Sequence, residues 1–318
     1  MERIEYGMVD MRREVTQAER TFNVSVVIPS HERHEEVLRA VRRVLAQTLV
    51  PVEVIVSNDG PDAEKGRLLA ELADQRVRFV EAPRRRSASA TRNFGVRHAR
   101  GNWIALLDDD DIWLPGKLAA QFTALKRSGR DEAILAGVEV VYADGERSHL
   151  RPSGAVPAGV PVSEVLFCGH GGAHTSTLMA PRWAFEKYPF DEGQERHEDW
   201  SWMLEAGQEL EVVVATEEVC ERHLAPGEGL SRPGGYPFSR GWYDGHKELM
   251  TPRARAAFVA NILSRKAAYD RRLGALPWMV GEVARQRGFS RRNLVRLVTP
   301  WLVPARARKA IKAAGVGQ

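Results

Sequence analysis

Cysteine is scarce in this sequence: there are only two, Cys168 and Cys220, and they match no metal-ligand spacing. Two cysteines are too few for a disulfide framework, which favours a reducing compartment. The sequence also lacks any uninterrupted apolar run that approaches the ~20 residues of a membrane-spanning helix. Its first fifteen residues are polar and charged, without the apolar segment of a cleavable signal. We therefore expect a cytoplasmic protein.

Acidic residues are almost missing from the last part of the chain. Residues 251–318 contain 15 Lys and Arg but only Asp270 and Glu282, whereas residues 1–250 contain 31 Lys and Arg against 40 Asp and Glu. Of all 318 residues, 43% are hydrophobic and 28% are charged, which is typical of a folded chain with a sizeable core. The excess of positive charge therefore lies in residues 251–318, whereas residues 1–250 are net acidic. The two parts of the chain can therefore attract partners of opposite charge.

Short apolar runs alternate with helical patterns over the first hundred residues. The expected buried strands are 24–28, 52–56, 77–80 and 103–107. Strands that are apolar on both faces and alternate with helices predict an α/β fold, with a Rossmann-like, mostly parallel sheet flanked by helices. We divide the chain into a polar N-terminal arm at 1–20, an α/β domain at 21–240 and a basic, helical C-terminal extension at 241–318.

Polar clusters follow three of these strands: SHER at 30–33, SNDG at 57–60 and DDDD at 108–111. Ligands of such sheets bind outside the carboxyl ends of the strands, so we expect the three clusters to form one site. One or two acids can cap a helix N-terminus, which is the structural alternative for the aspartates. Four adjacent carboxylates favour instead a divalent cation with oxygen ligands.

Five motifs, in order over residues 24–206, resemble those of the family 2 inverting glycosyltransferases, which have the GT-A fold. LDDDDIWLPGKL at 107–118 resembles the family's Leu-Asp-x-Asp-Asp-x-Trp-x-Pro-x-x-Leu stretch. The other four segments are VSVVIPSHERHEEVLRAVRRVLAQT, VEVIVSNDGPD, SASATRNFGVRHARGNWIALLDDDD and FDEGQERHEDWSWMLEA. Any one of these motifs alone would be a weak signal, and their order makes the match specific.

The resemblance implies a glycosyltransferase that moves a sugar, with inversion, from a nucleotide-sugar donor to a hydroxyl of a saccharide or lipid-linked acceptor. UDP is the commonest donor nucleotide in the family, and cell-surface polysaccharide synthesis is the expected setting. A nucleotidyltransferase would normally show a glycine-rich, basic phosphate loop after the first strand, and PSHERHEE is not one. A non-catalytic nucleotide- or membrane-surface-binding module should have lost the acids, which are all present.

By the same resemblance, the four aspartates differ in role. Asp110 is expected to contact the metal, and Asp108 the ribose or the metal and its water shell. Asp109 fills the variable position of the motif within the donor site, and Asp111 is expected to serve the helix that follows. A metal that bridges the phosphates would neutralise the charge that develops on the departing nucleoside diphosphate.

The resemblance also assigns the remaining donor contacts by position. Pro29, His31 and Glu32 border the nucleotide base, Asn58 and Asp59 grip the base or ribose, and Arg92 and Asn93 approach the base or diphosphate. A polar helix start and a type I turn at Asn-Asp-Gly are the structural alternatives for the first two groups, and the turn can coexist with binding.

The second acidic motif is HEDW at 197–200. The resemblance makes Asp199 the general base that takes the proton of the acceptor hydroxyl, and Glu198 an acceptor-binding or orienting partner. The alternative is a helix start, because an apolar helical pattern begins at Trp200. We also assign Trp200 to the acceptor side.

Two further pairs of residues are weaker candidates. His174 and Thr175 fall in an expected strand beside the acceptor, although a small-residue strand that packs on the core would explain them equally well. Arg222 and His223 are expected in a loop that closes over the diphosphate.

The basic tail, residues 289–315, mixes Leu, Val and Trp with Arg and Lys in short helices broken by Pro300 and Pro304. Such segments can lie in a membrane interface, and they can equally be a helical extension that packs on the catalytic domain. The first alternative would place the protein peripherally on the inner face of the cytoplasmic membrane. No nucleic-acid-binding motif is present, so no nucleic-acid partner is expected.

Overall fold

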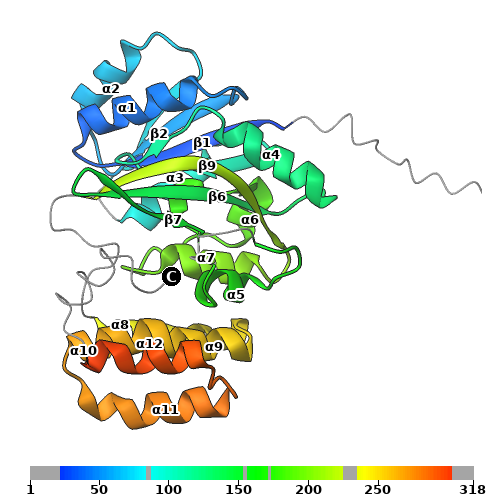
Figure 1. Ribbon diagram of the computed structural model, residues 1–318. Helices are drawn as coiled ribbons and strands as arrows, with labels where there is room; N and C mark the ends of the chain where they lie inside the picture. The colour runs from blue at the N-terminus through cyan, green and yellow to red at the C-terminus, as the bar shows by residue number, and fades with distance from the viewer. Residues whose placement is uncertain (1–21, 84–86, 153–155, 171–172, 225–234, 303–318) are drawn as a thin grey trace, which may run out of the picture.

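The computed structural model describes residues 22–83, 87–152, 156–170, 173–224 and 235–302. In this part of the chain, a nine-stranded sheet has the order β3-β2-β1-β4-β8-β6-β9-β5, and β7 pairs with β6. Helices cover both faces of the sheet, and a further group of C-terminal helices lies below it (Figure 1). The predicted N-terminal arm, 1–20, lies outside the described residues.

The first four strands form the parallel sheet that the sequence predicts. They are β1 (Val24–Ser30), β2 (Glu53–Asn58), β3 (Val77–Glu81) and β4 (Trp103–Leu106). β1 pairs in parallel with both β2 and β4, and β2 pairs in parallel with β3. Their carboxyl ends therefore lie along one edge of the sheet.

The other half of the sheet is mixed. Its strands are β5 (Ile112–Trp113), β6 (Ile134–Ala143), β7 (Glu146–Arg151), β8 (Met179–Pro181) and β9 (Val212–Leu224). β8 is antiparallel to β4 and β6, whereas β9 is parallel to β6. β9 is much longer than the expected 210–215 strand, because its polar second half continues to pair with β6 as far as Leu224. Arg222 and His223 therefore lie in a strand, and their prediction in a loop is corrected.

Two sets of helices pack on opposite faces of the sheet. One face carries α1 (His34–Leu45), α2 (Ala63–Ala70) and α4 (Lys117–Ser128), and the other carries α3 (Ala88–Arg97), α5 (Val162–Phe167), α6 (Arg182–Lys187) and α7 (Glu198–Ala206). Successive strand residues point to opposite faces. Val26 and Ile28 therefore pack in the first core, and Val27 packs in the second.

The C-terminal helices are α8 (Tyr236–His246), α9 (Pro252–Phe258), α10 (Ser264–Tyr269), α11 (Leu276–Arg285) and α12 (Arg291–Leu302), and a π-helical segment, η4 (Val259–Leu263), joins α9 to α10. The predicted extension boundary, residue 241, falls within α8. Phe258 packs against Phe167 of α5, with ring centroids 5.0 Å apart. These helices therefore share a core with the α/β layer. None of the described helices is long and apolar enough to cross a membrane.

Candidate active site

A cavity of about 770 Å³ opens at the carboxyl ends of β1, β2 and β4. The polar residues that follow these strands meet there, because the parallel register brings the strand ends together: the Asp59 backbone N–H donates to the Ser30 carbonyl at 2.9 Å. Ten of the predicted site residues line the cavity: Pro29, His31, Glu32, Asp59, Arg92, Asp108, Asp109, Asp110, His174 and Arg222. Ser30, Arg33, Ala88, Thr91 and Asp111 line it as well.

Arg33 holds two of the four aspartates. One guanidinium nitrogen donates to Asp109 Oδ1 at 2.9 Å and to Asp110 Oδ2 at 2.6 Å. Asp109 is buried, and burial raises its pKa despite the neighbouring Arg33 and Ser30. Asp110 is exposed. The sequence placed Arg33 in the SHER segment expected to border the nucleotide base, but it did not predict that Arg33 pairs with Asp109 and Asp110.

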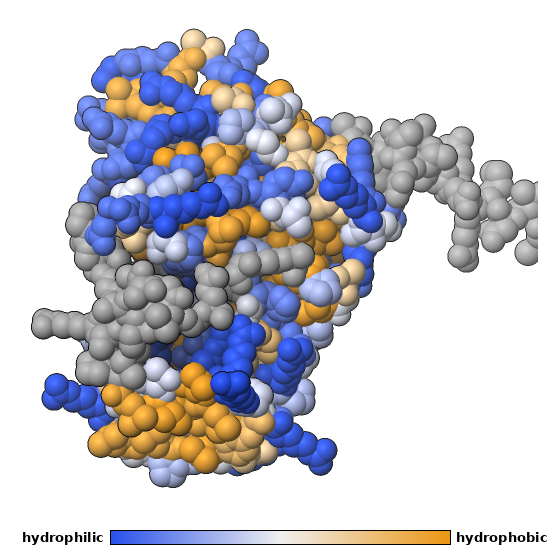
Figure 2. All heavy atoms as spheres, in the orientation of Figure 1, coloured by the Kyte–Doolittle hydropathy of each residue, from blue (hydrophilic) through white to orange (hydrophobic). Residues whose placement is uncertain are grey.

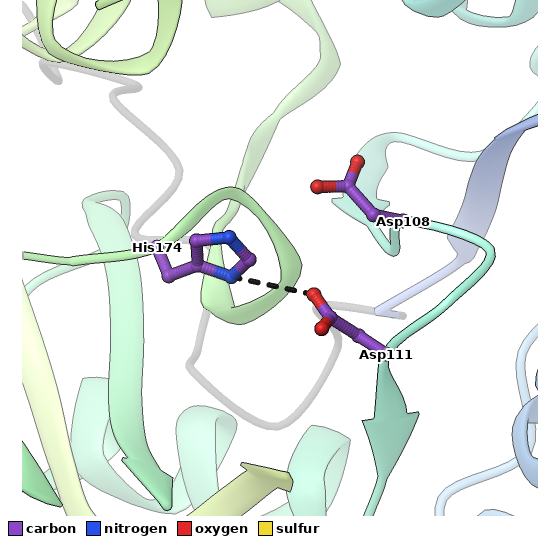
Figure 3. A group of neighbouring side chains, drawn as sticks. All are labelled: Asp108, Asp111 and His174. Atoms are coloured by element: carbon purple, nitrogen blue, oxygen red, sulfur yellow. Dashed lines mark ion pairs between the residues drawn. The ribbon is translucent and has the colours of Figure 1, made fainter. Parts of the chain in front are cut away.

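The other two aspartates face His174 (Figure 3). Each of Asp108, Asp111 and His174 offers a ligand atom, and these atoms all lie within 4.8 Å of one another. His174 Nδ1 lies 3.4 Å from Asp111 Oδ2. Of the predicted metal pair, Asp108 belongs to this cluster, whereas Asp110 is turned to Arg33.

Asp111 does not serve the following helix, which corrects that expectation. α4 begins only at Lys117, after Gly116, and has no acid in its first turn. Asp111 is instead buried, and burial raises its pKa to about 7, with His174 opposing the shift and Asp108 adding to it. The Ser176 hydroxyl donates a hydrogen bond to this buried carboxylate and holds it in the interior.

Ser176 positions both clustered aspartates. Its hydroxyl accepts the backbone N–H of Asp108 at 3.0 Å and donates to the carboxylate of Asp111. Trp113 Nε1–H donates to the Ser176 carbonyl at 2.7 Å, which fixes the turn. Sequence reasoning missed Ser176, because a serine within HTSTLM carries no signal until the fold brings it to the aspartates.

The segment around Ser176 is a 3₁₀ turn, η2 (Thr175–Thr177), and only Met179–Pro181 forms a strand. The expected strand through His174 and Thr175 is therefore corrected. The turn points His174 into the cavity, while Thr175 is buried and does not line it. The carbonyls of Ser176 and Thr177 accept from the side chains of Trp113 and Gln121, both at 2.7 Å, rather than from a neighbouring strand.

Glu139 of β6 stands behind His174. Its side chain is fully buried, and Oε1 lies 3.2 Å from His174 Nδ1. Within the described part of the chain, neither carboxylate oxygen of Glu139 makes a hydrogen bond, and neither does His174 Nδ1, whose contacts with Glu139 and Asp111 are ion pairs only if the imidazole is protonated. A buried polar group without a partner is energetically unfavourable, and carboxylates with an imidazole form a donor set that suits a divalent cation. The residues present therefore fit a metal. The only sequence signal for Glu139 was an acid inside an apolar strand.

Arg92 connects the two acidic motifs. It is buried and donates to Asp108 Oδ1 at 2.7 Å and to Glu198 Oε1 at 3.3 Å. Burial alone would raise the pKa of Asp108, but Arg92 and His174 outweigh it and hold that pKa below its ordinary value. The guanidinium thus keeps Asp108 ionised and places Glu198 at the same site.

Asp199 is in the first turn of α7, next to Glu198. Its Oδ1 accepts the Trp200 backbone N–H at 2.8 Å. Burial and the neighbouring Glu198 raise the pKa of Asp199 to about 6. A carboxylate with a pKa close to neutrality is suited to accept a proton near physiological pH.

The remaining predicted residues hold the surrounding structure. Asn58 donates to the Gly60 carbonyl at 2.7 Å and accepts from the buried Lys65 at 2.7 Å. Asn93 makes two hydrogen bonds with the Phe190 backbone, at 2.8 and 3.0 Å. Neither residue lines the cavity, so both fix loops that border it.

Trp200 and His223 also lie away from the cavity. Trp200 packs among aromatic rings, including His197 at 4.3 Å and Phe167 at 5.2 Å between centroids. His223 stacks on Tyr142 at 4.6 Å between centroids. Arg222 is the member of the β9 pair that lines the cavity.

Residues 25–180 match the model of glycosyl transferase family 2. The resemblance to this family is thereby confirmed for residues 25–180. One relative is the amylovoran biosynthesis glycosyltransferase AmsB of Erwinia amylovora. It is 25% identical over 244 residues, which are 73% of this chain and 80% of that protein.

Two other family relatives match over shorter segments. The succinoglycan biosynthesis protein ExoO of Rhizobium meliloti is 34% identical over 123 residues, 39% of this chain and 35% of that protein. The UDP-Glc:alpha-D-GlcNAc-diphosphoundecaprenol beta-1,3-glucosyltransferase WfgD of Escherichia coli is 29% identical over 107 residues, 34% of this chain and 42% of that protein. The chain thus spans less than half the length of these two relatives.

Solved structures support the fold. The S. aureus TarS 1–349 structure in complex with UDP-GlcNAc has a TM-score of 0.53 and 12% sequence identity, and covers 92% of this chain and 88% of that chain. At this identity the likeness concerns the fold alone, and it agrees with the predicted GT-A architecture.

Proposed function

We propose that the chain transfers a sugar from a UDP-sugar to a hydroxyl of a saccharide or lipid-linked acceptor, with inversion at the anomeric carbon. The observation that carries this proposal is the Arg92 bridge, because it joins Asp108 at the donor cavity to Glu198, the neighbour of Asp199. Neither Glu198 nor Asp199 lines the cavity itself, and we propose that this bridge lets the donor-binding acids and the base act together. The donor class is supported by WfgD, a UDP-Glc-dependent glucosyltransferase, and by the UDP-GlcNAc bound to TarS.

In the proposed reaction, Asp199 accepts the proton of the acceptor hydroxyl. The hydroxyl oxygen attacks the anomeric carbon from the face opposite the nucleotide, and the bond to the diphosphate oxygen breaks with both electrons leaving on the diphosphate. Glu198 orients the acceptor, while Arg222 contributes positive charge at the cavity. Asp59, His31 and Glu32 border the nucleoside.

We further propose that Asp108, Asp111 and His174 hold a manganese or magnesium ion, with Asp110 as the alternative ligand that the sequence predicts. When bound, a divalent cation neutralises charge on the diphosphate as a Lewis acid. Isothermal titration calorimetry of the purified protein with manganese chloride measures ion binding. Comparing variants distinguishes the cluster of Asp108, Asp111 and His174 from the sequence-predicted pair of Asp108 and Asp110. Asp111→Asn and His174→Ala should each weaken manganese binding. A larger loss of affinity in Asp110→Ala than in these two variants would favour the sequence-predicted pair.

The decisive experiment for the transferase activity compares Asp199→Asn with the matched variant Asp244→Asn, at an exposed acid on α8. UDP release is measured with a panel of UDP-sugars and saccharide acceptors in the presence of manganese. Loss of the general base should reduce kcat by about 10²–10⁴-fold. The donor affinity should stay unchanged in both variants, and Asp244→Asn should keep full activity.

Full transfer by Asp199→Asn would contradict the assignment of the base. Release of sugar 1-phosphate instead of UDP would indicate transfer of the uridylyl group, as in a nucleotidyltransferase, and donor binding without any turnover would indicate a non-catalytic module. For the acceptor, a lipid-linked saccharide would place the reaction at the inner face of the cytoplasmic membrane, where we propose that the chain works peripherally.

A further inference from the structure

α12 has two apolar faces, and only one of them is buried. Leu297 is buried, and Trp301 Nε1–H donates to Ser264 Oγ at 2.9 Å, which holds the helix on α10. On the other apolar face, exposure reaches 44% at Leu294, 56% at Val295, 46% at Val298 and 75% at Leu302. Their spacing of one, four and eight residues from Leu294 puts them on one stripe of the helix.

The apolar surface continues beyond α12. Leu273, before α11, is 67% exposed, and Val280 on α11 is 44% exposed. Phe289, in the connection between the two helices, is 50% exposed. Figure 2 shows apolar side chains gathered over the C-terminal helices at the bottom of the view, with hydrophilic side chains at the sides. We call the exposed apolar residues of 273–302 the α11–α12 face.

This face differs from an ordinary surface. Single exposed apolar residues are normal, but a contiguous group of them marks an interaction site. Neither α11 nor α12 needs these side chains for its own packing, because each helix buries a different set: Met279 and Val283 on α11, and Leu297 on α12.

The charges around the face all have one sign. Exposed arginines lie near these residues in the sequence, before α11, at its C-terminal end and at the start of α12: Arg271, Arg272, Arg285, Arg287, Arg291 and Arg292, the last of which also donates to the Cys168 carbonyl at 3.2 Å. The two acids of residues 251–318 both have partners. Glu282 is buried, accepts from Tyr243 Oη at 2.8 Å and pairs with Arg285, and Asp270 accepts the Tyr236 backbone N–H at 2.8 Å. An approaching anionic surface therefore meets arginines and no opposing free carboxylate from this segment.

We propose that the α11–α12 face docks on an anionic lipid bilayer. Aliphatic side chains and Phe289 enter the interface between headgroups and acyl chains, and the bordering arginines contact the phosphates. Basic residues near such a surface are attracted to it electrostatically, and salt screens this attraction. The proposal goes beyond the transferase activity, because it concerns a surface of the C-terminal helices and holds whether or not the sugar-transfer proposal is correct.

The test is vesicle flotation of the full chain with phosphatidylcholine vesicles, either pure or containing 30% phosphatidylglycerol (roughly the anionic fraction that gives a strong surface potential). The double variant Val295→Glu/Val298→Glu places two acids on the face. Val50→Glu/Val52→Glu is the matched control, since Val50 and Val52 are 58% and 45% exposed and lie far from the face in sequence. All four positions are exposed, so we expect every variant to fold, as checked by circular dichroism.

The native chain and the control should float with the anionic vesicles, and the partition coefficient of Val295→Glu/Val298→Glu should be at least tenfold lower. A chain ending at Leu302 should retain binding, because the face is intact. The proposal is overturned if the native chain does not bind anionic vesicles, or binds neutral ones equally well. It is also overturned if removal of 303–318 alone abolishes binding, or if light scattering shows a dimer that the face variant disrupts without any vesicle binding.

Discussion

Four consecutive aspartates are stable here because the fold gives each of them a different environment. Asp109 and Asp110 share Arg33, Asp108 pairs with Arg92, and Asp111 is held by Ser176. Like charges at close range favour protonation of some members, whereas a cation favours ionisation. The pKa of Asp111 is accordingly raised by burial, and that of Asp108 is lowered by Arg92 and His174 against the effect of burial.

The proposed base predicts a pH dependence. Because burial and Glu198 raise the pKa of Asp199 to about 6, its carboxylate is protonated below that pH and cannot accept a proton. We expect kcat/KM for the acceptor to fall about tenfold per pH unit below about pH 6 and to level off above it. Steady-state rates between pH 5 and 8, at saturating manganese, measure this fall of kcat/KM, the acid limb of the pH profile.

The residual activity of Asp199→Asn provides the control for this profile, because its acid limb should disappear. A limb that persists in the variant would show that another group titrates. A native profile that stays flat down to pH 5 would contradict the role of Asp199 as base.

At the scale of elements, close contact between α3 and the sheet explains a glycine in the Arg-Asn motif. A Cβ at Gly95 would lie 2.5 Å from Val27 Cγ1 and 3.1 Å from Ser57 Cβ. α3 can therefore approach β1 and β2 only without a side chain at this position. That approach sets the position of Arg92, one turn earlier on the same helix.

We predict that Gly95→Ala destabilises the protein, although alanine is the better helix former. Overpacking of this kind lowers the free energy of unfolding by about 1–3 kcal/mol. Gly241→Ala on α8 is the matched control, since a Cβ there would meet nothing within 4 Å. It should stabilise by about 0.5–1 kcal/mol. Urea unfolding followed by fluorescence measures both, and equal effects of the two substitutions would refute the packing argument.

At the scale of the whole molecule, the C-terminal helices are part of the main core. Phe258, Val259, Leu263 and Leu297 belong to the same buried cluster as Val27 of the central strand. Removing these helices would expose the apolar side of α5 and α7, including Phe167 and Trp200. The described part of the predicted extension, up to Leu302, is thus packed on the α/β layer along one face and leaves another apolar face outside.

We therefore predict that a chain truncated after residue 250 does not fold to the native state. Loss of several large buried side chains removes well over the roughly 5–15 kcal/mol of a typical domain's stability. A chain truncated after Leu302 is the control and should unfold with the native midpoint. Near-ultraviolet circular dichroism and thermal melting measure the outcome, and a cooperative, native-like transition of the shorter chain would contradict the prediction.

Much of the site's location could be read from the sequence. Apolar runs in alternation with helices specified the parallel strands β1 to β4, because burial on both faces leaves a continuous hydrophobic pattern. Polar residues directly after those strands had to share one edge, so Asp59, Asp108 and the SHER segment met as expected. Local order along the chain was sufficient for these predictions.

Contacts between distant segments were decided only by the tertiary structure. Arg92 joins Asp108 to Glu198, Ser176 captures Asp111, and Glu139 lies behind His174. Arg92 is 16 residues from Asp108 and 106 residues from Glu198 in the sequence. No periodicity or spacing predicts contacts between side chains at such separations. The sequence by itself determined the parallel half-sheet and the acids at its edge. Packing of β6, β9 and the helices determined which acids cluster and which are neutralised by arginine. It also determined which apolar face stays exposed. Each of these outcomes depends on the combined geometry of segments that are far apart in the chain.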